Sequence, residues 1–133
     1  MRGALFATVA LVVGGSAAVV NQGPAASAAP VQAPIGVRIR VQVLNATATR
    51  GLARRATAYL RDRGFDVVEI ATADSTRDST LVVDRSGRPE WARLVAAAFG
   101  GARVESRPDS SRYLDVTVLV GRDWTPPAEP FYP

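Results

Sequence analysis

The sequence predicts an α/β fold, a small two-layer sandwich in which two helices pack on one face of a mixed sheet. Three observations indicate it. Short segments rich in valine and isoleucine alternate along the chain with two segments whose apolar residues recur at helical spacing. Glycine follows each helical segment, where a left-handed residue commonly ends a helix. The order of the segments is βαββαβ plus a final β-strand.

The first two strands are predicted at residues 37–44 and 66–71. In the first, apolar residues occupy every second position, which is typical of a half-buried strand, and Arg38, Arg40 and Gln42 fall on its other face. A helix separates the two segments. Two strands joined by a crossover helix are expected to run parallel in the same sheet.

The connecting helix is predicted at 50–63. Thr47 or Thr49 could cap its start by accepting a bond from a free backbone amide, and Gly64 is suited to end it in the left-handed conformation. The apolar residues at helical spacing form one stripe that faces the sheet. They are Leu52, Ala56, Tyr59 and Leu60.

The second half of the domain repeats the pattern. A polar loop leads into a strand at 80–84, and Pro89 then starts a helix that ends at Gly100-Gly101. Short strands follow at 102–106 and 114–121. The last of these is apolar on both faces, which favours a central position in the sheet.

The two ends of the chain differ from this domain. Residues 3–20 are uncharged and apolar, which predicts either a membrane anchor or a signal peptide cleaved after Ala28. Residues 21–36 read as a proline- and alanine-rich linker, the domain as 37–124, and 125–133 as a proline-rich tail whose neighbour Trp124 folds back onto the domain. In both cases the domain is expected outside the cytoplasm, either anchored to the inner membrane or secreted.

Composition narrows the possible functions. The chain has no cysteine and no histidine, so acid/base chemistry would depend on carboxylates, and disulfides and thiolate ligands are excluded. All of its basic residues are arginine, with a formal net charge of +4. A codon bias toward arginine and alanine is the simpler interpretation, and a mild excess of arginine could still favour binding to an anionic surface such as cell-wall polymer or lipid headgroups. No nucleic-acid partner is expected, because the predicted strands 37–43 and 80–83 lack the aromatic residues that stack bases.

Three blocks of sequence carry a resemblance to a known family. They read VQVLNATATRGLARRATAYLRDRGFDVV, DSTLVVDRSGRPEWARLVAAAFG and LDVTVLVGRDW. Together they resemble the carboxy-terminal domain of LytR/CpsA/Psr cell-envelope proteins, a domain that in this family also stands alone behind a single membrane segment. Ala46 and Ala48 replace glycines that are usual in the family. The matching positions are Asn45, Gly51, Leu52, Gly64, Phe65, Asp84, Ala92, Asp115, Thr117, Val118, Gly121 and Asp123.

The resemblance implies an envelope location and an accessory role. The family's catalytic domain, which transfers lipid-linked glycopolymers to the wall, does not occur in these residues. Its phosphotransferase activity and its metal are therefore not carried over. We expect no enzyme activity, no cofactor and no metal. The predicted function is that of a non-catalytic envelope module that binds a wall glycopolymer or an envelope protein.

The candidate binding site is the loop that opens onto the first helix. Free amides and the dipole at a helix start favour phosphate or carboxylate, and nearby arginines would add positive charge. A turn with solvated arginines is the simpler interpretation, because no phosphate-loop pattern is present. The candidate residues are Asn45, Thr47, Thr49, Arg50, Gly51 and Arg54.

An alternative function is that of an enzyme, or an enzyme subunit, which acts on an anionic envelope glycan. Carboxylates are the residues available for such chemistry, and the candidates lie near one another in the chain: Asp74, Asp78 and Asp84. No histidine or third ligand accompanies them, so a solvated loop also explains the first two. A deep pocket with clustered carboxylates would favour this alternative.

Overall fold

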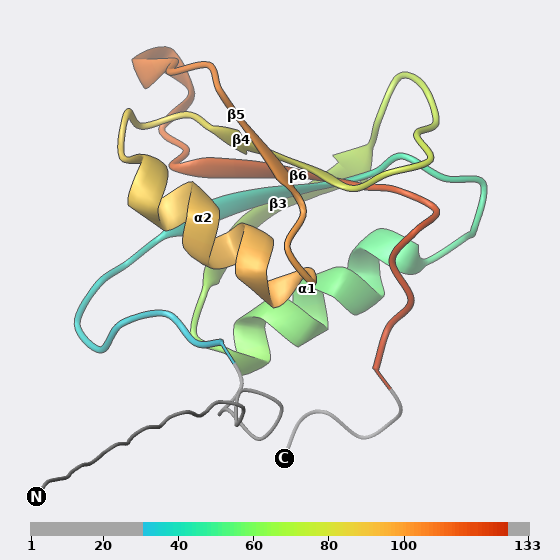
Figure 1. Cartoon of the computed structure of the whole chain (residues 1–133), viewed down its shortest axis with the longest axis horizontal. Helices are drawn as coiled ribbons and strands as arrows, with labels where there is room; N and C mark the ends of the chain where they lie inside the picture. Colours follow the sequence, from blue (N-terminus) through green and yellow to red (C-terminus); the bar gives the residue numbers. More distant parts are fainter. Residues whose placement is uncertain (1–30, 128–133) are drawn as a thin grey trace, which may run out of the picture.

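The computed structural model describes residues 31–127 and shows the predicted α/β sandwich (Figure 1). The strands are short, and each helix lies between two of them in the chain. In order, the elements are β2 (Arg40–Asn45), α1 (Leu52–Asp62), β3 (Asp66–Thr72), β4 (Leu81–Asp84), α2 (Pro89–Ala98), β5 (Arg103–Ser106), the 3₁₀ helix η3 (Ser110–Arg112) and β6 (Val116–Val120). All seven predicted helices and strands are present, with ends shifted by a few residues.

The five strands form one mixed sheet in the order β3-β2-β6-β4-β5. β2 pairs in parallel with both β3 and β6, which confirms the predicted strand-helix-strand unit. β4 pairs in parallel with β5 and antiparallel with β6, so it joins the two halves. The final strand β6 lies at the centre, as its apolar sequence predicts.

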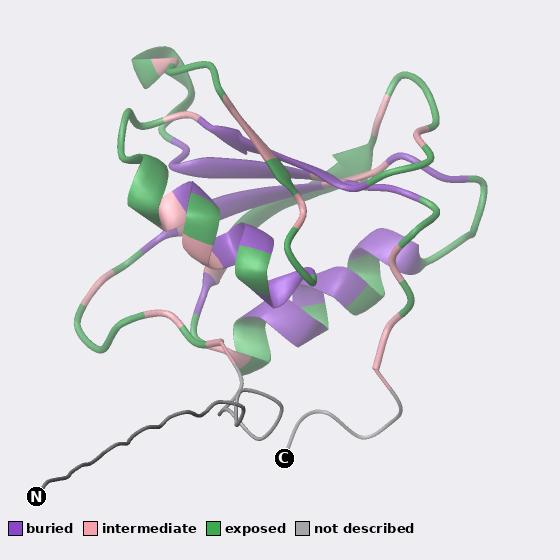
Figure 2. Cartoon of the chain, in the orientation of Figure 1, coloured by how far each residue is buried: buried purple, intermediate pink, exposed green. Residues whose placement is uncertain are grey.

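Both helices cover the same face of the sheet, and the core lies between the two layers (Figure 2). Val41, Val43, Val116 and Val118 from the central strands are fully buried there. The predicted stripe of α1 faces them, and its members Leu52, Ala56, Tyr59 and Leu60 are all buried. Packing of valines beneath two amphipathic helices is therefore the main stabilising contact of the domain.

Both helices end as the sequence predicts. After α1, Gly64 has φ 87° and its amide bonds to the carbonyl of Arg61, while the amide of Phe65 bonds to that of Leu60. The same arrangement follows α2 at Gly100 and Gly101. Glycine adopts this left-handed conformation without the steric cost that a Cβ atom would add. The chain can thus turn directly into β3 and β5.

The start of α1 differs from the prediction. The helix begins at Leu52, and its cap is Gly51 in the left-handed conformation, with no side-chain cap. Thr47 and Thr49 do not cap it. The hydroxyl of Thr47 accepts a bond from the amide of Thr49 instead, so it serves the loop before the helix.

The sheet face opposite the helices is more buried than its sequence suggests. Gln42 is 5 % exposed and Thr117 is fully buried. The Thr117 hydroxyl donates to Oε1 of Gln42 at 2.9 Å and accepts a bond from Nε of Arg85 at 3.1 Å. Polar groups on this face satisfy one another beneath the arginine side chain, which explains why they can be buried without a covering helix.

The chain beside the domain is described only in part. The predicted anchor or signal segment 1–20, residues 21–30 of the linker and 128–133 of the tail lie outside the described residues. Val31 and Ala33 at the end of the predicted linker pack against the core, and Trp124 folds back onto it as predicted. Neither helix within residues 31–127 is long and apolar enough to cross a membrane.

Candidate functional site

Asn45 organises the loop between β2 and α1. Its Oδ1 accepts bonds from the amide of Thr47 at 3.0 Å and from the hydroxyl of Thr47 at 2.6 Å. Its Nδ2 donates to the carbonyl oxygen of Thr49 at 2.8 Å. These bonds satisfy the side-chain amide within the loop. Asn45 is therefore a positioning residue that holds the turn leading to Gly51.

The six predicted site residues separate into two shallow hollows. Four of them share a hollow of about 420 Å³ with the end of β3; these are Asn45, Arg50, Gly51 and Arg54. Thr47 and Thr49 line a different hollow of about 370 Å³ with Leu52, Arg122 and Trp124. The two sets lie in different hollows although their members alternate along the loop. The structure thus brings together the two arginines and separates them from the threonines.

Arg50 and Arg54 border the first hollow, which we call the loop hollow. Both side chains are exposed, and neither forms an ion pair with a residue between 31 and 127. The first turn of α1 has no acidic residue, and Gly51 supplies no side chain to its free amides. The positive end of the helix and two uncompensated guanidinium groups therefore face one open surface.

Of the three carboxylates in the alternative enzyme hypothesis, Asp78 and Asp84 have structural partners, and Asp74 is exposed. Asp84 is 1 % exposed, and its oxygens accept bonds from Ser86, Gly87 and Ser106. Asp78 forms an exposed ion pair with Arg122. Within residues 31–127 no group of three acidic side chains could hold a metal ion. The turn after β4 explains Asp84 without any catalytic role.

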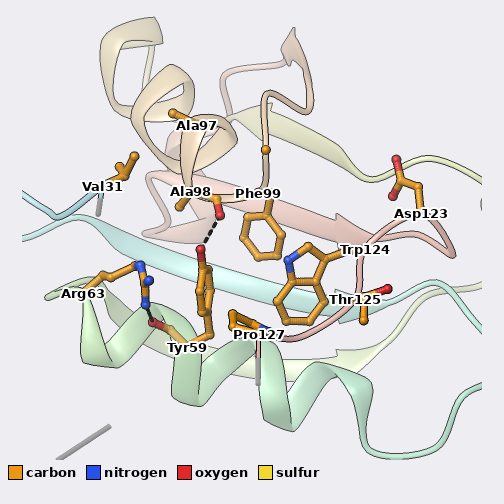
Figure 3. A pocket seen from close by; sticks show the side chains of 11 residues that line it. Val31, Tyr59, Arg63, Ala97, Ala98, Phe99, Asp123, Trp124, Thr125 and Pro127 are labelled. Carbon is orange, nitrogen blue, oxygen red and sulfur yellow. Dashed lines mark hydrogen bonds between the residues drawn. The ribbon is translucent and has the colours of Figure 1, made fainter. Parts of the chain in front are cut away.

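A further cleft between the helices was not predicted from the sequence (Figure 3). It has a volume of about 620 Å³ and lies where Tyr59 of α1 meets Phe99 and Trp124. The Tyr59 hydroxyl donates to the carbonyl of Ala98 at 2.6 Å, and the Trp124 ring lies 5.6 Å from that of Tyr59 and 5.2 Å from that of Phe99. Because these rings pack on one another, their main effect is to attach the tail to the core, and they offer little open aromatic surface to a ligand.

Arg63 forms one wall of this cleft. Its guanidinium lies 3.9 Å from the centre of the Tyr59 ring, and its Nε is buried without an acceptor among the described residues. Stacking on the ring compensates part of the cost of that buried donor. In the sequence, the contact between Arg63 and Tyr59 could have been signalled only by the position of Tyr59 in the predicted helix and by Gly64, the residue after Arg63.

These features define a class of protein. It is a small α/β sandwich domain whose surface carries shallow hollows and exposed arginines. The family model named LytR_C and described as LytR cell envelope-related transcriptional attenuator matches residues 38–124, more than half of the chain, and the chain belongs to this family. No curated protein and no solved structure matches it.

Membership confirms the resemblance found in the sequence. The family is associated with the cell envelope, and its accessory character agrees with the non-catalytic role expected for this chain.

Proposed function

We propose that this chain is a non-catalytic accessory module of the cell envelope that binds an anionic wall glycopolymer through the loop hollow. The observation that supports it is the pair Arg50 and Arg54, which border one hollow and have no ion-pair partner within residues 31–127. Arginine is well suited to this task, because its planar group donates two parallel bonds to a phosphate or carboxylate.

The shape of the loop hollow supports a polymer ligand. It is a shallow surface formed by the start of α1 and the end of β3, with Ile70, Ala71 and Thr72 as its floor. Enclosed pockets bury most of a small ligand, whereas an extended chain needs an open surface that it can cross. Repeated anionic groups along such a chain would meet the arginines and the free amides of α1 together.

A protein partner is the second candidate, and one observation favours it. β3 is an edge strand, and on it Val68 is 46 % and Ile70 is 45 % exposed. An exposed edge strand can accept a further strand from another chain. A bond from Arg61 already occupies the carbonyl of Val67, so only part of the edge is open.

The location of the module is part of the proposal. Residues 1–20 would act as a membrane anchor or a signal peptide and 21–36 as a linker, which would hold the domain outside the cytoplasm. A fusion reporter at the carboxyl end tests this. Activity of a reporter that works only outside the cytoplasm is expected, and a cytosolic signal would contradict the proposed role.

A pull-down tests the glycopolymer. The full-length chain in non-ionic detergent is mixed with purified peptidoglycan that retains its anionic polymers, at low salt and at about 150 mM salt. The double variant Arg50→Gln/Arg54→Gln is expected to lose most of the retention. Salt should reduce retention of the wild type, because screening weakens contacts between exposed charges.

The matched control is Arg93→Gln/Arg103→Gln, which removes the same charge from the exposed surface of α2 and β5. This control should be retained like the wild type. Equal losses in both double variants would show that net charge alone determines retention. Failure of the wild-type chain to bind at any salt concentration would overturn glycopolymer binding and favour the edge of β3 as a protein-binding site.

A further inference from the structure

A second basic hollow, of about 380 Å³, lies at the opposite end of the sheet from the loop hollow. Its lining includes Arg40 at the start of β2, Arg85 after the end of β4, and Ser110 and Tyr113 from the segment before β6. β4 runs antiparallel to β6, so its end lies beside the starts of β2 and β6. We call this surface the Arg85 hollow.

The charge of Arg85 is only partly compensated, because Asp109 attracts it while Arg112 and Arg107 repel it. Its Nε donates to the hydroxyl of Thr117 at 3.1 Å and its Nη1 to the carbonyl of Arg107 at 3.4 Å, both neutral acceptors. Within residues 31–127 it forms no ion pair with a carboxylate. The pKa of Arg85 lies below its ordinary value because of partial burial, with a further contribution from the nearby charge of Arg112. A half-buried cation of this kind is stabilised by an anion.

The neighbouring arginines differ in this respect. Nε of Arg40 lies 3.1 Å from the carboxylate of Asp115, and Nε of Arg112 lies 3.2 Å from that of Asp109. Each of these two cations therefore has its own counter-charge. Arg85 is the one of the three that forms no ion pair with a carboxylate within residues 31–127.

Tyr113 presents an aromatic ring at the rim of the same hollow. It is the only non-glycine residue with positive φ among residues 31–127, at φ 56°, and it is 76 % exposed. Asp109 holds the preceding turn by accepting a bond from the amide of Ser111, and the buried Leu114 holds the chain on the other side. The strain of this backbone conformation is not offset by packing of the exposed ring. Strained residues of this kind occur at binding sites.

We propose that the Arg85 hollow binds a phosphate group carried on a sugar ring, with Arg85 bonding to the phosphate and Tyr113 stacking on the ring. The apolar C–H face of a pyranose or an inositol fits an aromatic ring, and the hydroxyl of Ser110 lines the same hollow. The inference does not depend on the loop hollow, which lies at the other end of β2 and uses Arg50 and Arg54.

Calorimetric titration of the full-length chain in non-ionic detergent tests the proposal. Glucose 1-phosphate is the probe, and inorganic phosphate and glucose are the comparison ligands. We expect glucose 1-phosphate to bind about tenfold more tightly than phosphate, since stacking adds to the ionic contact. Binding of inositol 1-phosphate with similar affinity would support the same chemistry and point to a lipid headgroup as its source.

Variants at Tyr113 separate binding from folding. Tyr113→Asn keeps a residue that tolerates positive φ and removes the ring, so the preference for glucose 1-phosphate over phosphate should vanish while the unfolding temperature does not fall. Tyr113→Phe should bind like the wild type. A fall in unfolding temperature that accompanies the loss of affinity in Tyr113→Asn would overturn the proposal, because the ring would then be structural.

Variants at the arginines complete the test. Arg85→Gln should weaken binding of both phosphate and glucose 1-phosphate at least about tenfold, and Arg85→Lys should restore part of it. Arg50→Gln/Arg54→Gln should change the affinity less than about twofold. Loss of binding in that double variant, or no binding of glucose 1-phosphate by the folded wild type, would overturn the assignment to the Arg85 hollow.

Discussion

Oδ1 of Asp123 lies 2.9 Å from the backbone nitrogen of Thr80 and 2.8 Å from its hydroxyl oxygen, and it accepts a hydrogen bond from each. The same Thr80 hydroxyl accepts a bond from the amide of Gly121 at 3.0 Å. One carboxylate thus fastens the segment after β6 to the residue before β4. This attachment positions the next residue, Trp124, against Tyr59 and Phe99 (Figure 3).

Replacing Asp123 should destabilise the domain. Asp123→Ala leaves the buried amide and hydroxyl of Thr80 without their acceptor, and we expect a loss of about 1–3 kcal/mol in the free energy of unfolding. Urea unfolding measures it. Asp123→Asn keeps an acceptor oxygen and should lose less, and an equal loss in the two variants would show that the charge and not the acceptor matters. Fluorescence of Trp124 should shift toward that of exposed tryptophan in Asp123→Ala.

Gly121 should tolerate no side chain. A Cβ atom there would lie 2.4 Å from the backbone carbon of Ser79 and 2.7 Å from the backbone nitrogen of Thr80. Backbone atoms cannot move aside cheaply, so Gly121→Ala should cost about 1–3 kcal/mol or more in unfolding free energy. Gly87→Ala is the control, since its Cβ would meet nothing within 4 Å and only the positive φ of 80° opposes it. It should cost about 1 kcal/mol, and a larger loss than in Gly121→Ala would contradict the account.

Asn45→Ala should loosen the loop before α1. The variant removes the acceptor of Thr47 and the donor to Thr49, which we expect to cost about 1–3 kcal/mol. Amide hydrogen exchange at Thr47 and Thr49 should accelerate relative to β6. Asn45→Asp keeps the acceptor and loses the donor, so it should be intermediate. Unchanged exchange in Asn45→Ala would show that the loop is held by other contacts.

Stability at low pH should depend on Asp109. Bonds from the side chain and backbone of Ser111, with a smaller contribution from Arg112, lower the pKa of Asp109 below its ordinary value of 3.8. A lowered native pKa stabilises the fold at pH values above the unfolded pKa, and this contribution is lost as pH falls through the native pKa.

The difference in unfolding free energy between wild type and Asp109→Asn should thus be constant from about pH 5 to pH 8 and change below about pH 4 in favour of the variant. Chemical unfolding at a series of pH values measures it. A difference that stays constant down to about pH 2 would show that Asp109 has the same pKa in the folded and unfolded states.

Local patterns in the sequence predicted the secondary structure because each element depends on nearby residues. The valines of β2 and β6 indicate strands, the stripe of α1 indicates its buried face, and Gly64 ends α1 at the expected residue. The start of α1 was predicted less well. A threonine cap and a glycine cap are both compatible with the residues before Leu52, and the bonds of Asn45 decide between them.

The candidate site, too, was predicted from the sequence only in part. Asn45, Arg50 and Arg54 are close in the chain, so the sequence could group them, but the folded loop places Thr47 and Thr49, which lie between Asn45 and Arg50, in another hollow. The separation of these sets follows from backbone dihedral angles, and a list of residue types does not contain them.

By itself, the sequence determined the α/β class, the order of strands and helices, and the family, because periodicity and chain motifs are local properties. Only the tertiary structure decided which distant residues meet. Gln42 and Thr117 are 75 positions apart, and Arg85 and Thr117 are 32 apart. Even so, these three side chains are joined by hydrogen bonds on the sheet face opposite the helices. The strand order β3-β2-β6-β4-β5 causes these contacts, since the register of strands far apart in the chain sets which side chains are neighbours.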